Sequence, residues 1–154
     1  MLDHKIELLQ QVPLFAGLPA SLLEAIAGAG EKQYFEANAD LITQGEPGDT
    51  AFLILSGKAG CLRFVNGETY VEDLWPGTLV GELGMLIETV HALTVTASER
   101  LRALAIGRDA FRLVMEENPA IAKHISDRLV MRLHGLAAQL REVDNRLAGS
   151  EEAA

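Results

Sequence analysis

Residues 80–95 read VGELGMLIETVHALTV, a stretch in which glycine and apolar residues surround a single early carboxylate. Gly81 and Gly84 allow the backbone to approach a neighbouring group closely at the end of a strand. Residues 83–86 predict one short helical turn, and the free N–H groups at the start of such a turn can converge on an anion. Glu82 lies beside these groups and can accept hydrogen bonds from a sugar hydroxyl. The stretch therefore predicts a site for a phosphorylated sugar.

The residues on both sides of this stretch have a β-type pattern. Short apolar segments alternate with turn residues throughout residues 33–107, including Pro47-Gly48 and Pro76-Gly77. Asn66-Gly67 lies between two β-type runs, which is the strongest short-range signal for a hairpin. Many short strands at such spacing are typical of a sandwich or a jelly-roll barrel. The candidate strands cover residues 33–36, 41–44, 51–56, 58–65, 69–75, 79–80, 92–97 and 101–106.

Helical patterns flank the β-rich region. Breaks at Val12-Pro13 and before Pro19 divide an N-terminal helical segment. The helical period returns with a helix over 108–117, and Asn118-Pro119 fits a cap followed by proline in the first turn of the next helix. We expect that long helix to run to about residue 147. The predicted divisions are an N-terminal helical segment (1–32), a β-barrel (33–107), a hinge with the long helix (108–147) and a flexible tail (148–154).

An apolar stripe follows the long helix at steps of four and three residues, which is the spacing of a heptad seam. One interpretation is that the helix packs this stripe on its own barrel. The interpretation favoured here is a parallel homodimer seam, because the stripe is long and the opposite face is well charged. The stripe consists of Leu129, Leu133, Leu136, Leu140, Val143 and Leu147.

Two blocks of this sequence resemble the cyclic nucleotide-binding domain family, of the type found in the catabolite activator protein and the regulatory subunit of protein kinase A. Residues 80–95 are similar to its phosphate-binding cassette, and residues 41–57 (LITQGEPGDTAFLILSG) are similar to its strand–turn–strand signature. The resemblance extends over about residues 8–147. It implies an eight-stranded jelly-roll β-barrel with N-terminal helices and a long C-terminal helix, and a cyclic nucleotide, cAMP or cGMP, as ligand. The candidate ligand-binding residues are Gly81, Glu82, Leu83, Gly84, His91, Ala92, Leu93 and Arg132.

The chain departs from the family pattern at positions that contact the ligand. The cassette arginine, which pairs with the cyclic phosphate in the family, is His91 here. A histidine offers fewer donors than the permanently charged guanidinium fork. Two hydroxyl residues that contact adenine in the activator protein fall at Leu136 and Ala137, neither of which can hydrogen-bond a base. Three interpretations of His91 stay open: a weaker phosphate contact, a position that has drifted because no phosphate binds, or a different ligand.

Composition excludes several classes of function. The formal net charge of −9 in 154 residues opposes direct contact with nucleic acid or anionic lipid. Cys61 is the one cysteine, and His124 and His134 are ten residues apart, so no metal site is expected. No apolar run is long enough to span a bilayer and the N-terminus is not a secretory signal, which predicts a cytoplasmic protein. No nucleophile–base pair is visible, so we expect no enzyme activity.

Two functional hypotheses follow. The first is a regulatory cyclic-nucleotide sensor in which ligand shifts the hinge near residues 108–118 and reorients the long helix. The sequence ends about seven residues beyond the seam, so we expect no helix-turn-helix module and an output through dimer contacts or an unidentified partner protein. The second is a degenerate, ligand-free member of the fold that acts as a dimerisation or protein-interaction module.

Overall fold

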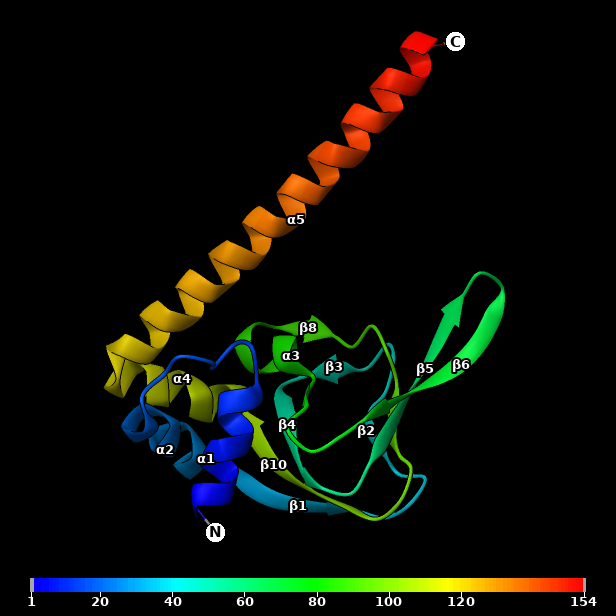
Figure 1. Cartoon of the computed structure of the whole chain (residues 1–154). Coiled ribbons are helices and arrows are strands. Elements are labelled where there is room, and N and C mark those ends of the chain that lie inside the picture. Colours follow the sequence, from blue (N-terminus) through cyan, green and yellow to red (C-terminus); the bar gives the residue numbers. More distant parts are fainter. Residues whose placement is uncertain (1, 154) are drawn as a thin grey trace.

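The computed structural model describes the backbone of residues 2–153 and the side chains of residues 4–148. Within this part, helices lie at both ends of a β-rich centre (Figure 1). The helices are α1 (Leu2–Gln11), α2 (Ala20–Gly28), α3 (Glu82–Leu86), α4 (Arg108–Glu117) and α5 (Pro119–Ala153). The strands are β1 (Glu31–Phe35), β2 (Asp40–Ile42), β3 (Pro47–Gly48), β4 (Thr50–Ser56), β5 (Ala59–Val65), β6 (Glu68–Leu74), β7 (Leu79–Val80), β8 (Thr89–Val90), β9 (Val95–Ala97) and β10 (Leu101–Gly107).

The strands form two antiparallel sheets of four strands, in the orders β1-β10-β4-β7 and β2-β9-β5-β6, with β3 and β8 as a separate pair. This confirms the predicted mainly-β architecture with flanking helices. The hairpin predicted at Asn66-Gly67 joins β5 and β6 in continuous register, and both turn residues have positive φ, at 53° and 80°. Two left-handed residues are the geometry of the turn that matches strand twist, which explains why this dipeptide predicted the hairpin.

The strand β4 connects two hydrophobic cores, because successive side chains of a strand point to opposite faces. Leu53 and Leu55 belong to a core shared with the helices, whereas Ile54 belongs to the core between the two sheets. Its neighbour β10 divides in the same way, with Leu104 in the first core and Ala103 in the second. A strand buried on both faces carries a continuous apolar run, and β4 has the run AFLIL between Thr50 and Ser56.

Ten strands are present in the described residues, against the eight expected, and the two additional strands are β3 and β8. Pro47-Gly48 was expected as a turn but pairs as β3 with β8 over two residues. The strand expected over 92–97 is shorter, since its ladder with β2 is irregular and begins at Val95. The Gln44 amide donates instead to the Thr94 side-chain oxygen at 2.9 Å. Residues 91–94 therefore run without strand pairing, which matters for the site below.

The long helix α5 begins at Pro119, as predicted, and extends well beyond the barrel (Figure 1). Ile121 and Ile125 are buried in the helical core, and Leu129 packs against the same core. Leu129 therefore belongs at least partly to the domain itself. The helix was expected to end near residue 147, but its backbone continues to Ala153. Residue 154 of the predicted tail lies outside the described residues, and the flexible tail stays a prediction.

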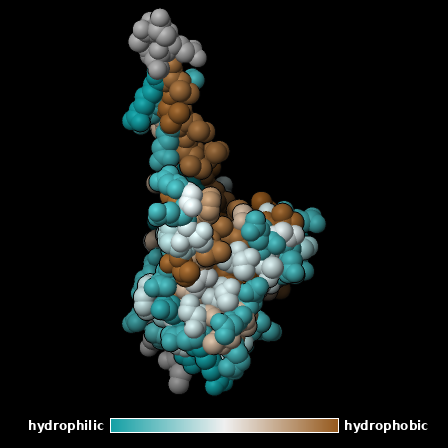
Figure 2. All heavy atoms as spheres, turned by 90° about the vertical axis from the view of Figure 1, so that its right-hand side faces the viewer, coloured by the Kyte–Doolittle hydropathy of each residue, from teal (hydrophilic) through white to brown (hydrophobic). Residues whose placement is uncertain are grey.

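The rest of the predicted seam is exposed. Its members beyond Leu129 have exposed fractions between 49% and 69%, and the space-filling view shows a continuous apolar stripe along the projecting helix (Figure 2). From Leu133 onward the stripe does not pack on the barrel of its own chain. The interpretation that the helix packs its stripe on its own domain therefore holds for Leu129 alone. The homodimer stays a prediction.

In the described part of the chain, helices that combine the length and apolarity needed to cross a membrane are absent.

Candidate ligand site

The short helix α3 forms the floor of the predicted cassette. Gly81 precedes it with φ of +77°, a left-handed conformation that a residue with a side chain rarely adopts. A Cβ on Gly81 would also lie 3.1 Å from the Thr50 carbonyl oxygen. A Cβ on Gly84 would lie 3.0 Å from the Gly48 carbonyl carbon, so α3 approaches β3 through its own glycine. Both glycines are therefore required by the close packing of this turn.

Two apolar side chains of α3 point away from the cavity, whereas Leu83 is 53% exposed and lines it. Met85 is 1% exposed and lies in the helical core, and Leu86 packs against the same core. Neither side chain fills the hollow above the turn. The buried face of α3 is thus formed by Gly84 and Met85, and Leu83 faces the cavity.

Several backbone amides around the cassette have no acceptor within the described residues. Those of Glu82 and Leu83 begin α3, and the first N–H groups of a helix have no intrahelical partner. Those of Ala92 and Leu93 follow β8 in the segment that lacks strand pairing. His91, by contrast, is tied on both sides: its amide donates to the Glu46 carbonyl and its carbonyl accepts from the Gly45 amide, each at 2.9 Å.

The predicted site residues come together around one open cavity of about 580 Å³. Every ligand-binding residue proposed from the sequence lines it, although Arg132 comes from α5, some 50 positions along the chain from Glu82. The sequence reasoning missed the other lining residues. These are Ile42, Arg63, Thr89 and Val90.

The His91 ring lies between two glycines. A Cβ on Gly48 would be 2.4 Å from the His91 Cε1 atom, and a Cβ on Gly81 would be 3.6 Å from it. The ring also borders a second cavity of about 240 Å³ on the side of β3. The imidazole therefore forms part of the wall beside the N-terminus of α3.

An ion pair connects the cassette to the long helix. The Arg132 Nη1 atom donates to Glu82 Oε1 at 2.8 Å, and the Glu82 side chain is 20% exposed. The second oxygen of Glu82 has no protein partner among the described residues, so it is free to accept from a sugar hydroxyl. Arg132 is thus more than a solvated helix residue: it links α5 directly to the site.

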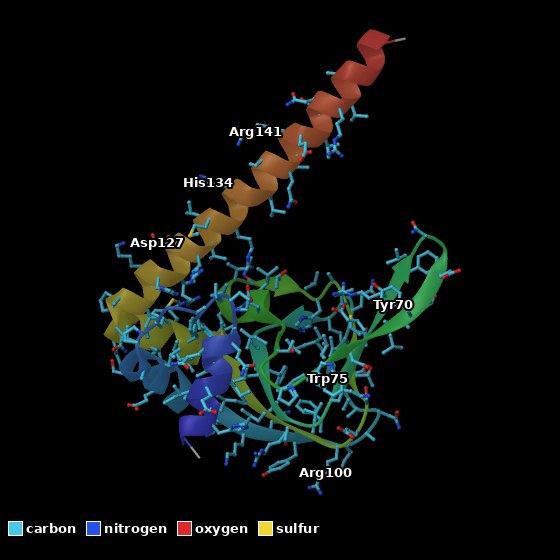
Figure 3. The ribbon with its side chains drawn as sticks, viewed as in Figure 1. Tyr70, Trp75, Arg100, Asp127, His134 and Arg141 are labelled. Carbon is cyan, nitrogen blue, oxygen red and sulfur yellow. The ribbon has the colours of Figure 1, made fainter. Side chains whose placement is uncertain are left out.

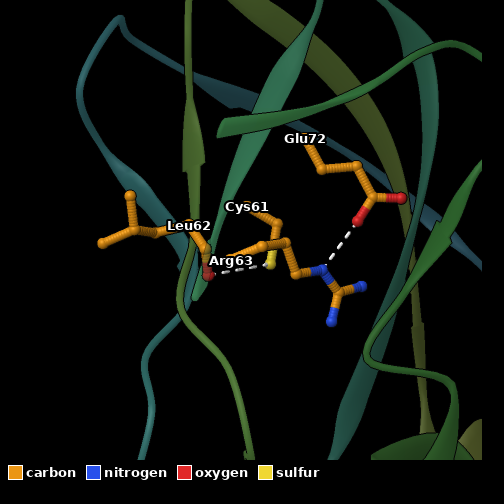
Figure 4. Close-up of polar contacts among 4 residues, drawn as sticks. All are labelled: Cys61, Leu62, Arg63 and Glu72. Carbon is orange, nitrogen blue, oxygen red and sulfur yellow. Dashed lines mark hydrogen bonds and ion pairs between the residues drawn. The ribbon is translucent and has the colours of Figure 1, made fainter. Parts of the chain in front are cut away.

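Arg63 brings a second guanidinium to the cavity from β5. Its Nε atom donates to Glu72 Oε2 at 2.7 Å (Figure 4). This hydrogen bond raises the pKa of Arg63 above its ordinary value, so the side chain stays charged. A sequence signal for Arg63 existed in the period-two alternation of β5, where Ala59 and Cys61 face the interior and Arg63 follows them.

Residues 4–148 contain no cluster of three or more histidine, cysteine or acidic side chains placed to hold a metal ion. The cysteine Cys61 is buried and free. The charged side chains that line the cavity include Glu82, Arg63 and Arg132, so the lining offers a ligand both hydrogen-bond donors and an acceptor.

Comparison with known proteins identifies relatives of the chain and a family match. The family model described as cyclic nucleotide-binding domain matches residues 32–118. A cAMP-dependent protein kinase regulatory subunit from Mucor circinelloides f. lusitanicus is 36% identical over 104 residues, which cover 67% of this chain and 24% of that protein. A CRP-like cAMP-activated global transcriptional regulator from Mycobacterium tuberculosis (strain ATCC 25618 / H37Rv) is 27% identical over 144 residues, covering 92% of this chain and 61% of the relative.

The chain thus spans less than two thirds of the length of either curated relative. Among solved structures, the N-terminal domain of a transcriptional regulator from Streptomyces coelicolor A3(2) superposes with a TM-score of 0.78 at 22% identity, covering 86% of this chain and 94% of that one. This likeness shows a shared fold, with its β-sandwich and flanking helices.

Proposed function

The chain belongs to the cyclic nucleotide-binding domain family, and from that membership we propose that it is a regulatory domain that binds cAMP or cGMP in the cavity at α3. The observation that carries the proposal is the set of unpartnered amides of Glu82, Leu83, Ala92 and Leu93 around one cavity. Amides that converge in this way favour a phosphate oxygen. The cyclic phosphate lies against these amides, and the ribose hydroxyl donates to Glu82.

The output of the domain runs through Arg132 to α5. Glu82 has two oxygens, one bonded to Arg132 at 2.8 Å and the other free for the ribose. A ligand that binds the free oxygen of Glu82 changes the environment of the ion pair between Glu82 and Arg132. The binding energy of the ligand therefore depends on the position of α5. Such a differential affinity is what a ligand needs in order to shift the helix. We expect α5 to signal through a parallel homodimer seam or a partner protein.

A second candidate is a ligand-free assembly module, which two observations favour. The cassette lacks its arginine, and the apolar stripe of α5 is exposed from Leu133 onward. In this case the barrel only carries the helix. Nucleotide then changes neither the affinity of the chain for its partner nor its oligomeric state.

Titration calorimetry of the chain with cAMP and with cGMP separates the two candidates. The sensor hypothesis predicts a saturable heat of binding for at least one of these nucleotides. It predicts a much weaker heat for the matched 5′-monophosphate. Glu82→Ala should weaken binding about tenfold, because it removes the acceptor of the ribose hydroxyl. Absence of heat with both nucleotides at millimolar concentration would favour the assembly module.

The route through Arg132 has its own test. Hydrogen exchange of residues 119–132 is followed with and without saturating nucleotide. Protection of the start of α5 should change with ligand in the native chain, and the change should be lost in Arg132→Met although the nucleotide still binds. An unaltered response in the variant would place the coupling elsewhere, for example in the hinge at α4.

A further inference from the structure

We propose that Arg102 is the centre of a second anion site, at the end of the barrel opposite the cassette, and that this site binds the phosphate group of a small molecule. Arg102 lines an open cavity of about 310 Å³ together with Tyr34, Ser56, Arg100 and Leu101. Ligand pockets in proteins occupy about 300–1,000 Å³, so this cavity has room for a small phosphorylated molecule. The site is independent of the cyclic-nucleotide cavity.

The two cavities lie at opposite ends of the same strand. Thr50 begins β4 and Ser56 ends it, and the Thr50 carbonyl oxygen packs against Gly81 at the start of α3. A strand rises about 3.3 Å per residue, so the two ends of β4 are about 20 Å apart. Figure 3 shows Arg100 at the bottom of the barrel, away from α5. A ligand at Arg102 therefore does not reach the cassette.

The guanidinium of Arg102 is partly buried and lacks an acceptor. Its Nε atom is buried without a hydrogen-bond partner among the described residues, and no ion pair in this part of the chain includes Arg102. The large majority of buried polar atoms in proteins are paired. A buried donor of a charged group without an acceptor is destabilising. A bound anion would remove this cost.

Three neighbouring strands bring the polar side chains of the cavity together. In the ladders of β10, Arg102 pairs with Tyr34 of β1 on one side and with Ser56 of β4 on the other. The register with β4 shifts between Arg102 and Ala103. Such irregularities are frequent where a sheet redirects a side chain at a binding site. The hydroxyl groups of Tyr34 and Ser56 thus belong to residues that flank the guanidinium.

Arg100 supplies a second guanidinium, which is only loosely held. Its Nε atom lies 3.5 Å from Glu36 Oε1, and both side chains are at least 70% exposed. Ion pairs with this exposure contribute little to stability. The Arg100 Cζ atom also lies 5.7 Å from the centroid of the Tyr34 ring, which keeps the guanidinium at the rim of the cavity. Arg100 can therefore turn toward an anion without the loss of a strong interaction.

The donors of this cavity favour phosphate over other anions. A guanidinium fork matches the oxygens of either a carboxylate or a phosphate. The two oxygens of a carboxylate lie in one plane, whereas phosphate oxygens point in several directions and can meet donors that come from different strands. The net charge of −9 opposes an extended polyanion, so the phosphate belongs to a small molecule. Inorganic phosphate and a simple phosphate ester share this chemistry.

The test is a titration of the full chain with inorganic phosphate, followed by NMR at constant ionic strength. The Arg102 Nε–H signal and the amide signals of residues 56–57 and 100–102 should shift and saturate. The amide signals of residues 82–83 and 92–93 report binding at the cassette separately. Glycerol 3-phosphate in a parallel titration distinguishes the two sources: tighter binding would identify an ester as the ligand, and equal affinity would identify free phosphate. Acetate should bind at least tenfold more weakly than phosphate.

Arg102→Met keeps the apolar stem and should weaken phosphate binding at residues 56–57 and 100–101 at least tenfold, because it removes a charge-assisted contact. Arg102→Lys serves if Arg102→Met fails to fold. A lysine keeps the charge but lacks the fork, so the loss should be smaller but still measurable. The matched control is Arg141→Met on the projecting part of α5 (Figure 3), which should leave the affinity unchanged.

Four results would overturn the inference. They are absence of a saturable shift of the Arg102 Nε–H signal at tens of millimolar phosphate, shifts confined to the cassette amides, equal affinity for acetate and phosphate, and an unchanged phosphate affinity in Arg102→Met. None of these results bears on cyclic-nucleotide binding, which is measured at the other end of the barrel.

Discussion

The substitution His91→Arg should strengthen cyclic-nucleotide binding. The His91 Cε1 atom lies 3.6 Å from where a Cβ would stand on Gly81, at the start of α3. An arginine there reaches the same space as the free amides. A hydrogen bond to a charged group contributes about 1.5–3 kcal/mol, against about 0.5–1.5 kcal/mol between neutral groups. The difference, about 1–1.5 kcal/mol, corresponds to a gain of about tenfold in affinity.

The assay is titration calorimetry at pH 7.5 with cAMP and cGMP, in 0.15 M and 0.5 M salt. The gain should be similar for both nucleotides, since the phosphate is common to them, and should shrink at the higher salt concentration. His91→Gln, which adds no charge, should show no gain.

A matched control adds the same charge elsewhere. His134 lies on the projecting part of α5, away from the barrel (Figure 3). His134→Arg should leave both affinities unchanged. If His91→Arg binds no better than the native chain, or if His134→Arg improves binding equally, then the phosphate does not lie between α3 and residues 91–93.

Three further predictions concern packing. Gly48→Ala should weaken nucleotide binding and lower Tm, because its Cβ would stand 2.4 Å from the His91 ring; an unchanged Tm would show that the ring moves freely. Leu136→Glu with Leu140→Glu should shift sedimentation from dimer to monomer with little change in the unfolding of the barrel, and a monomeric native chain would contradict the seam. Phe111→Ala should lower the free energy of unfolding by about 3–5 kcal/mol in urea, since Phe111 is fully buried and packs on Phe15; a loss below about 1 kcal/mol would contradict the described core.

Local signals in the sequence predicted those features that depend on neighbouring residues. Asn66-Gly67 accepts the positive φ values that a tight hairpin needs, and Asn118-Pro119 ends one helix and begins another. Gly81 and Gly84 marked the turn of α3 because close approach excludes larger residues. Each of these features is decided within a few positions of the chain.

The pairing of β3 with β8 was not predicted, and its reason is length. Each strand has two residues, and they are separated by some 40 positions. Two residues carry no period, and Pro47-Gly48 has the composition of a turn. The pairing continues in the hydrogen bonds of His91 with Gly45 and Glu46, which again join segments far apart in the chain.

The glycine turn of α3 and the division into N-terminal helices, a β-rich centre and C-terminal helices were predicted from the sequence itself, because glycine placement, turn chemistry and apolar period act over short distances. The tertiary structure alone decided that Arg132 meets Glu82, that Arg63 enters the same cavity from β5, and that the α5 stripe separates into a packed Leu129 and an exposed remainder. These contacts join residues that lie far apart in the chain. Their partners are set by how the sheets and helices pack, which no local pattern specifies.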